Sequence, residues 1–403
     1  MNKTALLPPE PQVAQLPWHK QLQQSLQQRR DAGLYRQTRQ RQGEQSVEVV
    51  VDGQSFLSFT SNDYLGLASH PDVRAAFIKV ASKEGVGSGA AHLLTGHSVH
   101  HQHLEEQLAA FCQQEAALLF STGYMANIGV IDALTGRNDA VIQDKLNHAS
   151  LLDGGRLSEA RQWRYAHNDM QQLHRRLHQT SDAGQRLIVS DGVFSMDGDL
   201  APLPEIMALA QQHRTAVLID DAHAIGVLGS QGRGSVEHWQ LEPASYPIVV
   251  GTFGKAFGTG GAFVAADEVV IETLRQNARS YVYTTAQPAA IAAATSVSLR
   301  LLQAESWRRE KLQALIDQFR RGAEQLGLPL MDSQTAIQPV LMGNEHQALA
   351  LGQSLEQQGI LVGVIRPPTV PAGSARLRIT FSALHQSEHV DRLLSALEQA
   401  CAH

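Results

Sequence analysis

Short apolar runs alternate with longer amphipathic stretches through the middle of the chain. Each run has the length of one buried strand and ends in small or polar residues. The spacing between the runs predicts helices, among them residues 169–178 and 204–213. Alternation of strands and helices favours an α/β fold with a mostly parallel sheet and helices on both faces. The predicted strands lie at residues 116–120, 140–143, 186–190, 216–219 and 248–251.

Changes in this pattern divide the chain into three parts. Residues 1–55 hold a proline-rich start (1–17), a helix over residues 18–45 broken at Gly33 and Gly43, and the start of a hairpin. Residues 56–303 hold the large sheet. Residues 304–403 form a smaller α+β domain that opens with a long charged helix. It continues with strands at 337–342, 361–365 and 376–381 and helices at 346–358 and 388–400.

Composition narrows the class of protein. The chain has 403 residues, 43% hydrophobic and 18% charged, with a formal net charge of -6, so a nucleic-acid partner is disfavoured. Its two cysteines suggest no disulfide framework. The apolar run near Met1 is too short for a secretion signal, and no run has membrane-spanning length. We therefore expect a cytoplasmic protein that binds neither nucleic acid nor membrane.

Polar and small residues gather where the predicted strands end. Since parallel strands present their carboxyl ends at one edge, open α/β sheets place ligands there. Each residue alone has an ordinary structural explanation, but together they indicate a binding site. The residues are Gly123 and Tyr124, His148, Ser195, Asp220 and His223, and Thr252 and Lys255.

Lys255 stands in a glycine-rich segment between two apolar runs. A lysine held in such surroundings shifts its pKa readily and suits Schiff-base chemistry with an aldehyde. A nucleotide-binding P-loop is excluded, because Gly251 is too close to Gly254 and Ala256 follows the lysine. Upstream, the turn at 121–127 joins a strand to a helix start, which is the geometry of a phosphate site.

A phosphate site, a Schiff-base lysine and a carboxylate together fit pyridoxal 5′-phosphate. Asp220 would keep the pyridine nitrogen protonated, and His223, three residues later, could bond the phenolic oxygen. In the C-terminal part, Arg376 and Arg378 alternate with apolar residues, so one of them could bind a substrate carboxylate.

A metal site is a weaker interpretation of the sequence. His97, His100, His101 and His103 include residues that could share a helical face. No acidic or cysteine partner lies at a supporting spacing, so we expect no metal there, and none elsewhere in the chain.

Six motifs resemble the α-oxoamine synthase family, which has the aspartate-aminotransferase-like fold of pyridoxal-phosphate-dependent transferases. The resemblance runs from about Trp18 to the C-terminus. The motifs are SNDYLGL at 61–67, NHASL at 147–151, GVFSMDG at 192–198, DDAH at 220–223, TFGK at 252–255 and PTVP at 368–371.

The resemblance implies a role for each matching residue. Lys255 would carry the cofactor and later move a proton, His148 would stack on the ring, and Ser195 would lie near the phenolic oxygen beside His223. Gly123, Tyr124 and Thr252 would hold the phosphate. For substrates, the implied residues are Arg36, Asn62, Thr369 and Arg378. The family is homodimeric, so Thr284 and Thr285 would reach the partner's phosphate.

The branch of the family that serves biotin synthesis matches best. It implies that L-alanine condenses with pimeloyl-CoA or a pimeloyl carrier-protein thioester and that CO₂ is lost. Residues 90–92 (AAH) depart from the family pattern, which leaves acyl recognition open. Three alternatives remain: a sister synthase such as glycine C-acetyltransferase or 5-aminolevulinate synthase, an aminotransferase of the same fold, and a cofactor-binding regulatory protein without activity.

Overall fold

The computed structural model describes residues 16–32, 34–242 and 245–401. It divides into two units, one of residues 1–42 and 50–54 and the other of residues 43–49 and 55–403. Among the described residues, no helix combines the length and the apolar character that crossing a membrane requires.

The first unit contains α1 (Pro17–Asp31) and the two-residue strand β1 (Arg41–Gln42). The helix predicted over residues 18–45 therefore ends early. Residues 34–42 contain no helix, and there Arg39 Nε and the Gln40 N–H both donate to the Asp52 carboxylate, at 2.8 and 2.9 Å. The predicted break at Gly33 and most of the predicted proline-rich start lie outside the described residues.

A seven-stranded sheet forms the centre of the second unit, in the order β4-β10-β9-β8-β7-β5-β6. Only β10 runs antiparallel to its neighbours, so the prediction of a mostly parallel sheet is confirmed. The strands are β4 (Ala116–Phe120), β5 (Ala140–Asp144), β6 (Arg161–Tyr165), β7 (Arg186–Asp191), β8 (Ala216–Asp220), β9 (Ile248–Thr252) and β10 (Ala262–Ala266).

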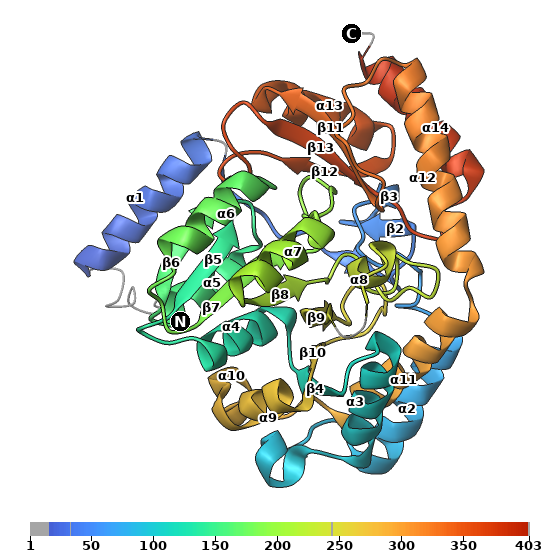
Figure 1. The fold of residues 1–403 in the computed structure, drawn as a ribbon. Helices are drawn as coiled ribbons and strands as arrows, with labels where there is room; N and C mark the ends of the chain where they lie inside the picture. Colours follow the sequence, from blue (N-terminus) through green and yellow to red (C-terminus); the bar gives the residue numbers. More distant parts are fainter. Residues whose placement is uncertain (1–15, 33, 243–244, 402–403) are drawn as a thin grey trace, which may run out of the picture. The chain divides into compact units, whose positions relative to one another are not determined.

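Alternate residues of these strands pack into different cores, which is the consequence of the two-residue period of a strand. Leu218 and Val250 join the core under α4 (Gly123–Leu134), α5 (Ala149–Leu157) and α9 (Glu268–Asn277). Ile219 and Val249 join the core under α6 (Met170–Gln179) and α7 (Leu203–His213). Helices thus cover both faces of the sheet, as predicted (Figure 1).

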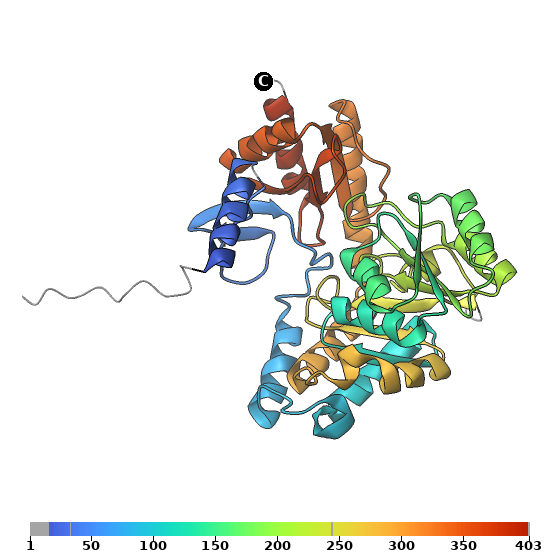
Figure 2. The same ribbon diagram turned by 90° about the vertical axis from the view of Figure 1, so that its left-hand side faces the viewer.

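A second sheet unites distant parts of the chain. Within the second unit, Leu57 of β3 (Gln54–Phe59) pairs with Ile360 of β12 in parallel, and β13 lies between β12 and β11. In Figure 2 the orange and red elements after residue 307 gather around this sheet. They are α12 (Trp307–Gln325), β11 (Ile337–Gly343), α13 (Glu345–Gln357), β12 (Ile360–Ile365), β13 (Ala375–Thr380) and α14 (Ser387–Cys401).

The remaining elements include β2 (Glu48–Val51), which continues from the second unit into the first, and a set of connecting helices. Those helices are α2 (Pro71–Glu84), the π-helical turn η2 (His92–Gly96), α3 (Val99–Cys112), α8 (Ser235–His238), α10 (Arg279–Val282) and α11 (Ala289–Ala304). A buried core joins α3, α11 and α12 to the small sheet. The domain boundaries at 55 and 303 stay predictions.

Candidate active site

A cavity of about 200 Å³ lies at the carboxyl ends of β7, β8 and β9 and beside the first turn of α4. This is the edge at which open α/β sheets place ligands. Seven residues singled out in the sequence line it, together with four that were not. The lining residues are Gly123, Tyr124, Asn127, His148, Ser150, Asp191, Asp220, Ala222, His223, Thr252 and Lys255.

Lys255 lies in the loop that follows β9, and its side chain is half-buried. Burial disfavours the charged ammonium and lowers the pKa of Lys255 to about 8, although the carboxylates of Asp220 and Asp191 act in the opposite direction. A substantial fraction of this amine is therefore neutral near physiological pH. A neutral amine is the form that attacks an aldehyde.

Asp220 ends β8 and is only 6% exposed. Its Oδ1 accepts the Ala222 N–H at 3.0 Å, and its Oδ2 accepts the amide of Asn127 at 2.6 Å. Asn127 comes from α4 and was not identified in the sequence. It lies one helical turn after Gly123, so both residues face the cavity. That four-residue spacing is the feature of the sequence from which Asn127 could have been predicted.

His148 begins α5 as its N-cap residue, and its side chain is exposed. The backbone N–H of His148 donates to Asp191 Oδ2 at 2.6 Å, while the ring atom Nδ1 lies 2.7 Å from Ser150 Oγ. Asn127 also donates to Ser150 Oγ, at 2.8 Å, so one network joins His148 to Asp220. Burial, followed by the charge of Asp220, raises the pKa of Asp191 well above its usual range.

His223 is buried and lies 2.5 Å from the Tyr64 hydroxyl through its Nδ1. Burial raises the pKa of Tyr64 to about 12, and burial lowers the pKa of His223 well below its usual range. The tyrosine thus keeps its proton and the imidazole is neutral. Tyr64 is then the donor to Nδ1, which leaves a proton on Nε2. Tyr64 belongs to the 61–67 motif but was given no role from the sequence.

The two arginines of β13 have different partners in the structure. Arg376 forms an ion pair with Asp197 and donates to the Met196 carbonyl oxygen, so its charge is engaged. Arg378 is also buried, but its Nε donates to the carbonyl oxygen of Ser195 at 2.6 Å.

The other contacts of Arg378 connect it to His223, which lines the cavity. Its Nη1 donates to Thr380 Oγ1 at 3.0 Å, and its Nη2 lies 3.4 Å from Asn62 Oδ1. Asn62 Oδ1 also lies 3.3 Å from the Tyr64 hydroxyl. Arg378 and Asn62 are therefore linked through Tyr64 to His223, and Ser195 contacts Arg378 through its backbone carbonyl oxygen.

The first turn of α4 presents its free N–H groups and its positive helix end to the cavity. Thr122 caps this helix by accepting the Met125 N–H at 3.2 Å. Across the cavity, Thr252 Oγ1 donates to the Gly261 carbonyl oxygen at 3.1 Å. Tyr124 is exposed, and its hydroxyl donates to Asp153. This end of the cavity suits an anion.

Some predicted residues do not line the cavity. Thr369 is exposed in the loop after β12. Thr284 is half-buried and Thr285 is exposed, and the Thr285 backbone pairs with Ala91. Arg36 is an exposed residue of the first unit, between α1 and β1. Their roles stay predictions.

The histidines of residues 97–103 are divided among separate contacts. His100 lies 3.1 Å from Glu84, and His101 accepts the Ser98 N–H at 3.0 Å and contacts the Gln287 carbonyl oxygen at 2.8 Å. His103 is exposed. His97 and His101 pack against each other, with ring centroids 5.5 Å apart, and His97 Nδ1 lies 2.9 Å from His92 Nδ1. The absence of a metal at these residues stays a prediction.

Comparisons with known proteins place this geometry in a family. The model of the family "aminotransferase class I and II" matches residues 54–397. An 8-amino-7-oxononanoate synthase of Thioalkalivibrio sulfidiphilus is 57% identical over 379 residues, which are 94% of this chain and 97% of that protein. One of Nitrosococcus oceani is 59% identical over 374 residues, 93% of this chain and 99% of that protein.

A solved structure shows the same fold. The serine palmitoyltransferase of S. paucimobilis, in a variant with a bound pyridoxal phosphate–myriocin aldimine, has a TM-score of 0.90 and 33% identity to this chain. The match covers 96% of this chain and 98% of that one. The predicted aspartate-aminotransferase-like fold is confirmed.

Proposed function

Because the chain belongs to the aminotransferase class I and II family, we propose that it is an enzyme that uses pyridoxal phosphate to join L-alanine to a pimeloyl thioester. The new carbon–carbon bond replaces the thioester bond, the thiol leaves, and the alanine carboxyl group departs as CO₂. The product is 8-amino-7-oxononanoate. The observation that carries this proposal is the identity of 57% and 59% to synthases of that name over nearly the whole chain.

The residues of the cavity fit the cofactor. Asn127 Oδ1 is buried without a hydrogen-bond partner among the described residues, and Asn127 lines the cavity. A lysine, a buried carboxylate and a helix N-terminus match an aldehyde, a pyridine nitrogen and a phosphate. When bound, pyridoxal phosphate supplies an electron sink for carbanion chemistry.

The chain's own groups then divide the work. Lys255 would hold the aldehyde carbon, and its amine, when free and neutral, would accept a proton from the substrate. Asp220, oriented by Asn127, keeps a proton on the pyridine nitrogen. His148 would cover the ring, and His223, whose Nδ1 accepts from Tyr64, would offer its Nε2 proton to the phenolic oxygen.

Substrate binding is assigned to the neighbouring shell. Arg378 has a guanidinium suited to the alanine carboxylate, and Asn62 lies beside it. We assign Gly123, Tyr124 and Thr252 to the phosphate and keep Ser195, Thr369 and Arg36 as predicted contacts of cofactor or substrate.

We also propose a cytoplasmic homodimer that takes its acyl group from CoA or from an acyl carrier protein. The described cysteines, Cys112 and Cys401, are both free thiols, which supports a reducing compartment. Thr284 and Thr285 are assigned to the partner's phosphate site.

A substrate panel tests the function. Purified holoenzyme is offered L-alanine, glycine or L-serine with pimeloyl-CoA, acetyl-CoA, succinyl-CoA or palmitoyl-CoA, and free thiol and CO₂ are measured. We expect turnover with alanine and pimeloyl-CoA. Turnover only with glycine and a short acyl group, or with serine and palmitoyl-CoA, would assign a sister activity and refute the proposal.

A second panel with pimeloyl carrier protein distinguishes the two thioester donors. Amino transfer to a keto acid without thiol release would instead indicate an aminotransferase. Cofactor binding without turnover of any pair would contradict an enzymatic role.

A further inference from the structure

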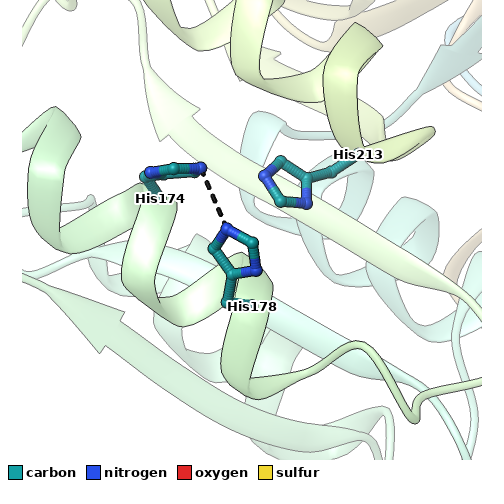
Figure 3. A group of neighbouring side chains, drawn as sticks. All are labelled: His174, His178 and His213. Atoms are coloured by element: carbon teal, nitrogen blue, oxygen red, sulfur yellow. Dashed lines mark hydrogen bonds between the residues drawn. The ribbon is translucent and has the colours of Figure 1, made fainter.

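Three histidines from two different helices meet on the surface of the large-sheet domain (Figure 3). His174 and His178 lie one turn apart on α6, and His213 is the last residue of α7. One ring nitrogen from each lies within 4.8 Å of the other two. The two Nε2 atoms of His174 and His178 are 3.1 Å apart, and the centroid of the His213 ring is 5.2 and 4.9 Å from those of His174 and His178.

Ordinary packing does not explain this arrangement. Imidazole rings are polar, and the His213 Nε2 atom is buried without a hydrogen-bond partner in the described part of the chain. Buried nitrogens of this kind are normally satisfied. The rings of His174 and His213 are half-buried, while His178 is exposed, so a solute can reach the cluster from solvent.

The geometry is close to that of a metal site. Histidine nitrogens bind Zn²⁺ at about 2.0–2.1 Å in a tetrahedral arrangement, which separates two ligand nitrogens by roughly 3.4 Å. The distance between His174 and His178 is already close to this value. The His213 nitrogen lies within 4.8 Å of the other two, so rotation of its side chain can bring it to the same centre, and water can take the fourth position.

The ends of two helices favour a cation at this cluster, whereas one nearby arginine opposes it. His178 and His213 lie in the last turns of α6 and α7, where the helix dipoles favour positive charge. Arg186 opposes a cation, but its guanidinium is bound to the carbonyl oxygens of Leu177 and His213. That contact also fixes the two helix ends next to each other.

We propose that His174, His178 and His213 form a binding site for a divalent transition metal of the Zn²⁺ or Ni²⁺ class, which ties α6 to α7. This departs from the sequence-based expectation that the chain holds no metal. The three histidines lie on α6 and α7, which lead into the amino ends of β7 and β8. The cavity lies at the carboxyl ends of the same two strands, about 20 Å away along the strands. The histidine site is therefore separate from the proposed catalytic function.

Metal titration of the tag-free holoenzyme tests the site. Calorimetry with ZnCl₂ and with NiCl₂ is expected to show one equivalent bound, with affinity at least tenfold lower in His178→Ala and in His213→Ala. His103→Ala removes an exposed histidine of α3 and should bind like the wild type. Equal affinity in all four proteins, or no binding to the wild type, would overturn the proposal.

Two further measurements separate a metal site from a loss of folding. Saturating Zn²⁺ should raise the melting temperature of the wild type and of His103→Ala, but not that of His178→Gln, which keeps a polar side chain of similar size. Paramagnetic resonance of the Cu²⁺-loaded protein should show coupling to at least two histidine nitrogens. Fewer nitrogens, or loss of the signal on pyridoxal phosphate removal, contradicts the assignment. Synthase activity should be unchanged in His178→Gln.

Discussion

Lys255 and Asp220 line the same cavity but have different surroundings. The lysine loses hydration on burial, and its pKa falls to about 8. The aspartate keeps a donor on each oxygen, from Ala222 and Asn127. The amine is thus prepared for attack and the carboxylate for pairing with a cation.

Removing the amine should abolish covalent capture of the cofactor. We expect Lys255→Ala to lose the absorbance of the holoenzyme near the short-wavelength end of the visible range. Its turnover should fall at least a hundredfold, since a positioned acid–base group contributes a factor of about 10²–10⁴. Spectra and thiol release measure both. The exposed Lys145→Ala serves as the matched control, and a Lys255→Ala protein with unchanged absorbance would refute the assignment.

Capture of the cofactor should also depend on pH. The neutral amine forms as pH rises through the pKa of Lys255, so the rate at which apo-protein captures pyridoxal phosphate should rise and level off above about pH 8. An ordinary lysine would continue to gain rate to about pH 10.4.

Absorbance after rapid mixing measures this profile. Asp220→Asn removes a charge that raises the pKa of Lys255, so its midpoint should move to lower pH. A profile that still rises beyond pH 10 in the wild type would contradict a buried amine.

Among the elements, His167 ties together the ends of two strands. It follows β6, and its ring lies 3.2 Å from Asp144 at the end of β5 and 2.8 Å from Asp199 in the loop after β7. Burial opposes its charge, but hydrogen bonds with the two carboxylates outweigh burial and raise the pKa of His167 to about 10. The loop that it holds also contains Ser195.

This tie should make stability depend on pH. Because the folded pKa of His167 exceeds the unfolded value of about 6.5, its contribution is fully present below that pH and is lost as pH rises through about 10. His167→Gln should lower the melting temperature by about 2 °C or more at pH 6, with a difference that shrinks toward pH 10.

Scanning calorimetry at several pH values measures this difference. His100→Gln is the control, because its pairing with Glu84 is partly exposed and contributes little. A pH-independent deficit in His167→Gln would mean that packing, not charge, holds these strands.

For the molecule as a whole, the proposed homodimer makes a prediction about shared sites. If Thr284 and Thr285 serve the partner's phosphate site, a dimer of one Lys255→Ala subunit and one Thr284→Val/Thr285→Val subunit has one site with both functions intact. Mixing and refolding the two variants should restore up to about half of the activity per heterodimer. No recovery, with heterodimers present by mass spectrometry, would place both residues outside the partner's site.

Much of this protein was determined by the sequence alone. Apolar runs bounded by polar residues predicted the strands of the large sheet, because a buried strand must be apolar along its length and must end where polar groups regain partners. The same rule placed Lys255, Asp220, His223 and His148 at one edge. The family resemblance, carried by short motifs around these residues, agrees with the comparisons.

Other features were decided only by the tertiary structure, because they depend on side chains that are distant in sequence. Asn127 acquires its role from a carboxylate 93 residues later, and Arg378 is distinguished from Arg376 only by what each contacts. Arg39 and the Gln40 N–H donate to Asp52, which lies 13 and 12 residues later in the sequence. His213 meets His174 and His178 only because two helices pack on one face of the sheet. Local pattern specifies elements, whereas convergence of polar groups requires the folded chain.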